Sequence, residues 1–177
     1  MADPRLPFLA ALERKALWLS SWMIHNANHL RSKGDGLKVG GHQASSASLA
    51  TIMTALYGAT LRPQDRVAVK PHAGPVLHAI HYLLGSQKRE QLENFRGFGG
   101  AQSYPSRTKD KIPVDFSTGS VGLGVAITLF AAPCSHTNTT VLSRDDDWTR
   151  SISASVSHQI CMNPSTFMTT QQAATKY

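Results

Sequence analysis

Two junctions in the chain place a histidine directly ahead of a segment with helical spacing. The first, over residues 40–58, reads GGHQASSASLATIMTALYG and holds His42, with Ser45 three residues later. The second, over residues 67–77, reads VAVKPHAGPVL and holds His72. An imidazole titrates near neutral pH, and one at an irregular junction beside a helix start can face a pocket. We therefore interpret His42 and His72 as the leading candidates for a functional site.

A third junction carries glycines in place of histidine. Residues 114–124 read VDFSTGSVGLG, a short apolar run followed by a glycine-containing turn. The order of the glycines, G-x-x-G-x-G, does not match the dinucleotide fingerprint G-x-G-x-x-G. Such a turn can present backbone amides to an anion at a helix start. It is equally typical of a tight turn that packs a helix on a strand, so both interpretations stay open.

The other histidines have structural explanations. His25 and His29 lie one helical turn apart, but the glutamate of an H-E-x-x-H zinc motif is missing between them. The GDG triplet at residues 34–36 is explained by a helix end followed by a turn. His78 and His81 stand between apolar residues of a helix and are expected to be partly buried and hydrogen-bonded. The sequence therefore predicts no metal ligands.

Hydrophobic spacing indicates which elements position these junctions. Apolar residues three and four positions apart predict a long helix over residues 7–32. A second helix follows His42, with a serine as its N-cap, an apolar face that includes Ile52 and Met53, and Gly58 at its end. Further helices are predicted over residues 73–84 and 88–96, and from the glycine turn to residue 132.

Two short apolar runs predict buried strands, RVAVK at residues 66–70 and VDF at residues 114–116. Each is followed by a turn and then a helix. This order predicts an α/β fold, a partial parallel sheet flanked by helices. Ligands bind at the carboxyl ends of the strands in such sheets, where helix N-termini point.

The character of the sequence changes at Pro133. Residues 133–177 are rich in Ser and Thr, show no sustained period of 2 or 3.6, and carry charges that cancel. A segment that buries little apolar surface does not offset its ordering entropy. We therefore predict one incomplete domain over residues 1–132 and an irregular, poorly ordered tail over residues 133–177.

Composition excludes several classes of protein. Hydrophobic residues make up 41% and charged residues 16% of the chain, which is typical of a globular domain. No apolar run approaches the ~20 residues that span a bilayer, and the first residues do not resemble a signal peptide. The net charge of +7 is scattered and forms no basic helix, so nucleic-acid binding ranks last among the hypotheses. We expect a cytoplasmic protein, with a mitochondrial location still open.

The three junctions together resemble a known family. GGHQASSASLATIMTALY, DRVAVKPHAGPVLHAIHYLLG and ENFRGFGGAQSYPSRTKDKIPVDFSTGSVGLGVAI follow the order and spacing of the N-terminal thiamine-diphosphate-binding domain of transketolase-like enzymes. The likeness is greatest to the homodimeric decarboxylating component of pyruvate dehydrogenase. It covers residues 38–131 and implies a thiamine diphosphate cofactor with magnesium, and a 2-keto acid or a ketose phosphate as substrate.

The resemblance also implies a role for each motif residue. His42 would face the substrate and the reacting ring of the cofactor, with Ser45 nearby. His72 would approach the diphosphate, and Lys70 would line the same pocket. The glycine turn would lie against the cofactor, with the residues Gly119, Ser120, Val121 and Gly122.

The chain departs from the family pattern after residue 132. The GDG motif and the asparagine that bind magnesium in the family are expected there, and the pattern is not followed. We therefore expect a truncated family member that is inactive alone. The alternatives are a non-catalytic interaction protein that pairs with a full-length relative and, third, a basic nucleic-acid-binding domain.

Overall fold

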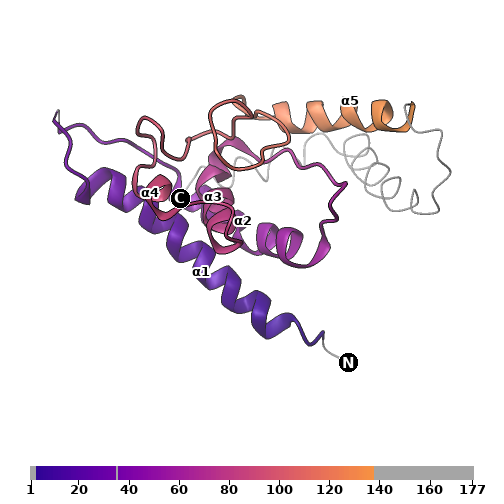
Figure 1. Ribbon diagram of the computed structural model, residues 1–177, viewed down its shortest axis with the longest axis horizontal. Helices are drawn as coiled ribbons and strands as arrows, with labels where there is room; N and C mark the ends of the chain where they lie inside the picture. The colour runs from indigo at the N-terminus through magenta and orange to yellow at the C-terminus, as the bar shows by residue number, and fades with distance from the viewer. Residues whose placement is uncertain (1–2, 35, 138–177) are drawn as a thin grey trace. The chain divides into compact units, whose positions relative to one another are not determined.

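The computed structural model of the chain describes residues 3–34 and 36–137 (Figure 1). The chain divides into two compact units, residues 1–124 and residues 125–177. Helix α5, Leu123–Thr137, supplies the described part of the second unit. The helix predicted to end at residue 132 thus continues through Pro133, which removes one intrahelical hydrogen bond without ending the helix. The rest of the predicted tail lies outside the described residues.

The long N-terminal helix is confirmed. Helix α1 spans Leu6–His25 and continues into a π-helical turn, Asn26–Leu30. Its predicted apolar stripe faces the core, where Ala16 and Met23 are fully buried. The spacing of large and small apolar residues on α1 therefore determines which face packs against the rest of the unit.

Helix α2 spans Gln43–Ala55 and buries a different face from the predicted one. His42 is its N-cap residue and no side chain caps it, so the predicted serine cap is wrong. Ile52 is 62% exposed, although it was expected on the apolar face. The buried positions, which share one helical face, are Ser46, Ala50, Met53 and Thr54. Small side chains let α2 approach its neighbours closely, which a purely hydrophobic pattern does not reveal.

Helix α3 forms the centre of the first unit. It spans Gly74–Leu83, begins after a 3₁₀ turn at Pro71–Ala73, and buries residues 74–81. Helices α1 and α2 both pack against it (Figure 1). A shorter helix, α4, spans Arg89–Glu93. The start of α3 thus fixes the position of the preceding turn, which contains His72.

The two predicted strands lie side by side, and the described residues contain no regular strand. The backbone amide of Val67 donates to Asp115 Oδ2 at 2.9 Å, and the Thr118 hydroxyl donates to the backbone oxygen of Val69. The segments therefore run in the same direction. Side chains rather than paired backbones join them, so no ladder forms here, and the parallel sheet stays a prediction.

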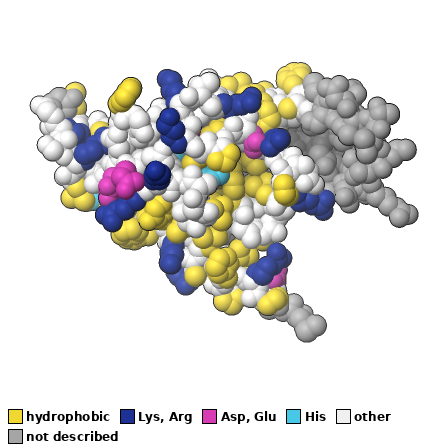
Figure 2. Space-filling model, in the orientation of Figure 1, with side chains coloured by type: hydrophobic (Ala, Val, Ile, Leu, Met, Phe, Trp, Pro, Cys, Tyr) yellow, Lys and Arg dark blue, Asp and Glu magenta, His cyan; other side chains and the backbone are white. Residues whose placement is uncertain are grey.

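Lys and Arg side chains are dispersed over the visible surface of the described residues (Figure 2), as expected from the sequence. Figure 2 shows Lys and Arg side chains spread over the visible face among hydrophobic ones. Among the described helices, none combines the length and the apolar character needed to cross a bilayer.

Candidate anion-binding site

The two candidate histidines meet in the structure. The ring centroids of His42 and His72 lie 4.0 Å apart, with 39° between the ring planes. His42 comes from the residue before α2, and His72 from the 3₁₀ turn before α3. The hydroxyl of Ser46 donates to the backbone oxygen of His72 at 3.4 Å and joins the two elements. The two imidazoles therefore lie together, while a functional site shared by them stays a prediction.

The charged groups that act on His72 are all cationic. Burial lowers the pKa of His72, and the nearby charges of His42, Lys70 and Arg96 lower it further. No carboxylate is among these influences. Cations placed together without an acidic partner repel one another, and a bound anion would relieve that repulsion. The electrostatics of this cluster therefore favour an anionic ligand.

Ser45 carries a hydroxyl that has no partner. Its Oγ is buried and makes no hydrogen bond among the described residues. Ser45 lies in the first turn of α2, three residues after His42. A buried hydroxyl without a partner is costly unless a ligand or water satisfies it. This is the position that the sequence predicts for a ligand contact.

The glycine turn and Lys70 lie at the same end of the two parallel segments. The Thr118 hydroxyl donates to the backbone oxygen of Val69, and the next residues in the chain are Gly119 and Lys70. Gly122 has a φ of 87°, which favours glycine. All four residues of the turn are exposed: Gly119, Ser120, Val121 and Gly122. Their predicted contact with a cofactor stays a prediction.

Two residues near the site were not predicted. Arg96 acts electrostatically on His72, and the ring of Tyr104 lies 6.1 Å from that of His72. Both follow α4 in the long connection to α5. The sequence signal for Arg96 is the run GFGG directly after it, which is typical of a tight turn. Neither position has the periodicity that identified the histidines.

The buried His78 fixes the position of the segment after α4 that contains Tyr104. His78 Nε2 donates to the backbone oxygen of Gln102 at 2.9 Å and lies 3.6 Å from Asp110 Oδ1. A Cβ on Gly74 would lie 2.6 Å from the backbone oxygen of Ser103, so the connection crosses directly over the start of α3. His78 is fully buried, beyond the partial burial that was expected. The position of Tyr104 beside His72 thus depends on core contacts.

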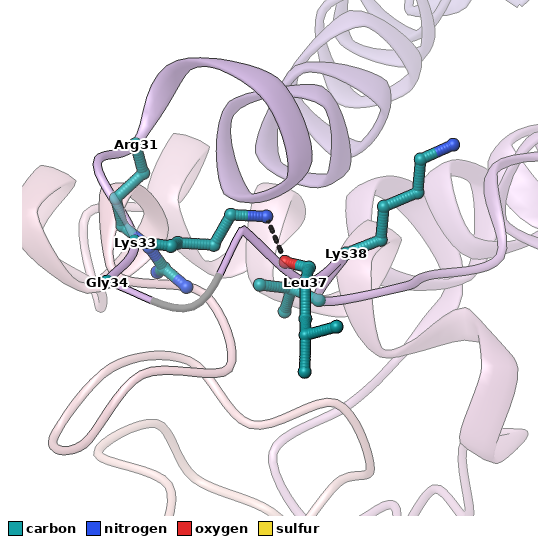
Figure 3. A pocket seen from close by; sticks show the side chains of 6 residues that line it. Arg31, Lys33, Gly34, Leu37 and Lys38 are labelled. Carbon is teal, nitrogen blue, oxygen red and sulfur yellow. Dashed lines mark hydrogen bonds between the residues drawn. The ribbon is translucent and has the colours of Figure 1, made fainter.

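A separate group of cations lies in the turn after α1. Six residues line an open hollow of about 630 Å³ (Figure 3): Arg31, Lys33, Gly34, Leu37, Lys38 and Val39. Lys33 Nζ donates to the backbone oxygen of Leu37 at 2.5 Å. Arg31 Nη1 donates to the backbone oxygen of Phe95 at 2.8 Å. Two of the three cations therefore hold backbone oxygens in place.

The residues described here do not form a metal site. Residues 3–34 and 36–137 contain no group of three or more His, Cys, Asp or Glu side chains that could hold an ion. His25 and His29 approach with ring centroids 4.9 Å apart, without a third ligand. Asp35 of the GDG triplet lies outside the described residues. Magnesium is commonly held by one or two carboxylates together with phosphate oxygens, so a magnesium ion bound with a diphosphate stays a prediction of the resemblance.

The chain is similar to the pyruvate dehydrogenase E1 component. It is 30% identical over 130 residues to that protein of Mycolicibacterium smegmatis, which covers 67% of this chain and 14% of the relative. It is 33% identical over 133 residues to that of Escherichia coli K12, covering 69% of this chain and 15% of the relative. No family model matches.

A third relative gives the same result. The pyruvate dehydrogenase E1 component of Haemophilus influenzae is 30% identical over 139 residues, which covers 73% of this chain and 16% of the relative. The chain therefore spans about one-seventh of the length of the curated relatives it matches.

Proposed function

We propose that this chain binds the diphosphate of thiamine diphosphate and forms part of a thiamine-diphosphate-dependent enzyme that acts on 2-keto acids. The observation that carries the proposal is the contact of His42 with His72 inside a cluster of cationic groups. The similarity to pyruvate dehydrogenase E1 components supports the choice of cofactor over other phosphate-bearing ligands.

Each residue of the cluster has a role in this proposal. His72 and Lys70 would bind the diphosphate, because the terminal oxygens need hydrogen-bond donors and positive charge. Ser45 would satisfy its free hydroxyl on the ligand. His42, the more exposed imidazole, would face the substrate and hold or release a proton there. The bound cofactor would supply the carbon nucleophile that the side chains of this chain lack.

Replacing His72 by alanine tests the site. We expect the wild-type chain to bind thiamine diphosphate with a dissociation constant weaker than micromolar, which corresponds to ~8 kcal/mol of binding free energy, because its sequence departs from the family's magnesium-binding motif. The His72→Ala variant should lose about tenfold in affinity, the effect of one hydrogen bond to a charged group. Calorimetric titration measures both values, and His42→Ala should weaken binding less.

A matched control is His25→Ala, which removes one ring of the exposed pair with His29. Its affinity should equal that of the wild type. Thiamine without its diphosphate should not bind measurably. Equal affinity of the wild-type chain for thiamine and thiamine diphosphate would contradict the proposal.

We expect no release of carbon dioxide from pyruvate by this chain alone, since it spans about one-seventh of the length of the relatives.

Gly119→Ala tests whether the cofactor approaches the glycine turn. A Cβ at Gly119 would meet nothing within 4 Å, so the free energy of unfolding should stay within about 0.5 kcal/mol of the wild type. If the cofactor lies against this backbone, the added methyl group should weaken its binding about tenfold. Gly34→Ala, also in open space, serves as the control. Unchanged affinity for Gly119→Ala would show that the turn only connects elements.

A further inference from the structure

Arg96 has a backbone conformation that requires explanation. Its φ is 61°, and it is the one non-glycine residue with a positive φ in the described part of the chain. A bulky residue in the left-handed region costs free energy and persists only where the surroundings determine it. The neighbouring Phe95 is 1% exposed and anchors the turn in the core. The fold therefore holds Arg96 in a strained position at the start of the GFGG run.

The guanidinium of Arg96 is held in place but incompletely bonded. Its Nη1 donates to the backbone oxygen of Val39, while Nε is buried and has no partner. A Cβ on Gly40 would lie 2.8 Å from Nη1, so a side chain there would displace the guanidinium. No carboxylate among the described residues pairs with Arg96. A guanidinium fixed in this way keeps donors available for another acceptor.

Arg96 lies near the histidine pair. Its guanidinium approaches Gly40, two residues before His42, and its charge acts on His72 together with those of His42 and Lys70. Arg31 offers the contrast, because it lies in the neighbouring turn and donates to three oxygens, those of Glu93, Asn94 and Phe95. Arg31 thus bonds to several oxygens, whereas the buried Nε of Arg96 has no acceptor.

We propose that Arg96 binds the anionic ligand directly, together with His72 and Lys70. This inference rests on the proposed function and adds to it a ligand-binding residue. A guanidinium suits this role because its planar donors match two phosphate oxygens at once. The strain at Arg96 is then explained by its position in the site.

The test is titration of the full chain with inorganic diphosphate and with thiamine diphosphate, at one fixed concentration of magnesium. We expect both ligands to bind. Arg96→Gln should lose about tenfold or more in affinity, and Arg96→Lys should lose less, since the charge remains. Arg89→Gln is the matched control, because Arg89 pairs with Glu93 on the surface.

A second variant separates binding from folding. Arg96→Gly accepts the positive φ without strain, so it should melt within a few degrees of the wild type while binding as weakly as Arg96→Gln. Wild-type affinity in a folded Arg96→Gly variant would overturn the inference and leave the proposed function intact. A wild-type chain that binds neither ligand would contradict the proposed function and the inference together.

Discussion

Replacing Asp110 by alanine should lower the free energy of unfolding by about 3 kcal/mol or more. The Asp110 side chain is 1% exposed and lies beside the fully buried His78. Its two oxygens accept hydrogen bonds from the backbone amides of Gln102 at 3.1 Å and Ser106 at 2.8 Å. Removing the carboxylate leaves these donors without an acceptor in the interior, which costs more than the bonds themselves contribute. Urea unfolding at neutral pH measures the change.

Asp65→Ala is the control for this experiment. Asp65 accepts an exposed hydrogen bond from the backbone amide of Arg62 at 2.8 Å, and its loss should cost about 1 kcal/mol or less. Asp110→Asn should fall between the two, since it keeps the size of the side chain and one acceptor. Equal stability of Asp110→Ala and Asp65→Ala would mean that Asp110 does not organise the segment that carries Tyr104.

Acid should destabilise the chain through its buried histidines. Burial lowers the pKa of His81 to about 4, and the neighbouring charge of His78 adds to the effect. In the unfolded chain a histidine has a pKa of about 6.5, so the full stability is present above that pH. As the pH falls toward 4, the unfolded chain takes up a proton that folded His81 does not accept. The free energy of unfolding should therefore fall by about 3 kcal/mol over this window.

The His81→Asn variant isolates this contribution. Asparagine keeps a polar atom toward Ser86, whose hydroxyl lies 2.8 Å from His81 Nδ1, and it does not titrate. Unfolding curves at several values of pH between 7 and 4 should be flatter for the variant by the same amount. The exposed His25→Asn variant should follow the wild type. A His81→Asn curve parallel to that of the wild type would assign the acid sensitivity to other groups, of which His78 is the first, since burial also lowers its pKa.

Local patterns in the sequence predicted the helices well. Apolar spacing predicted α1 and α3 because the period of a helix is written in consecutive residues. The same spacing failed for α2, where Ser46 and Thr54 occupy the buried face and Ile52 is exposed. Burial of a small polar side chain depends on how closely a neighbouring helix approaches. That approach is a property of the packed unit, so hydrophobicity alone does not predict it.

The two predicted strands also show that a local sequence pattern does not determine tertiary contacts. RVAVK and VDF were predicted as strands from their composition, and the two segments do run side by side in one direction. Whether backbones pair depends on a register that is set by partners elsewhere in the chain. In the described residues, side chains of Asp115 and Thr118 make the connection instead.

The sequence by itself determined that His42, Ser45 and His72 stand at helix starts, because the beginning of helical spacing and the preceding turn are local features. Only the tertiary structure decided that the two imidazoles lie 4.0 Å apart. It also decided that Arg96 reaches the backbone of Val39, 57 residues earlier in the chain. Those distances follow from how α1, α2 and α3 pack, and packing couples residues that no short pattern connects.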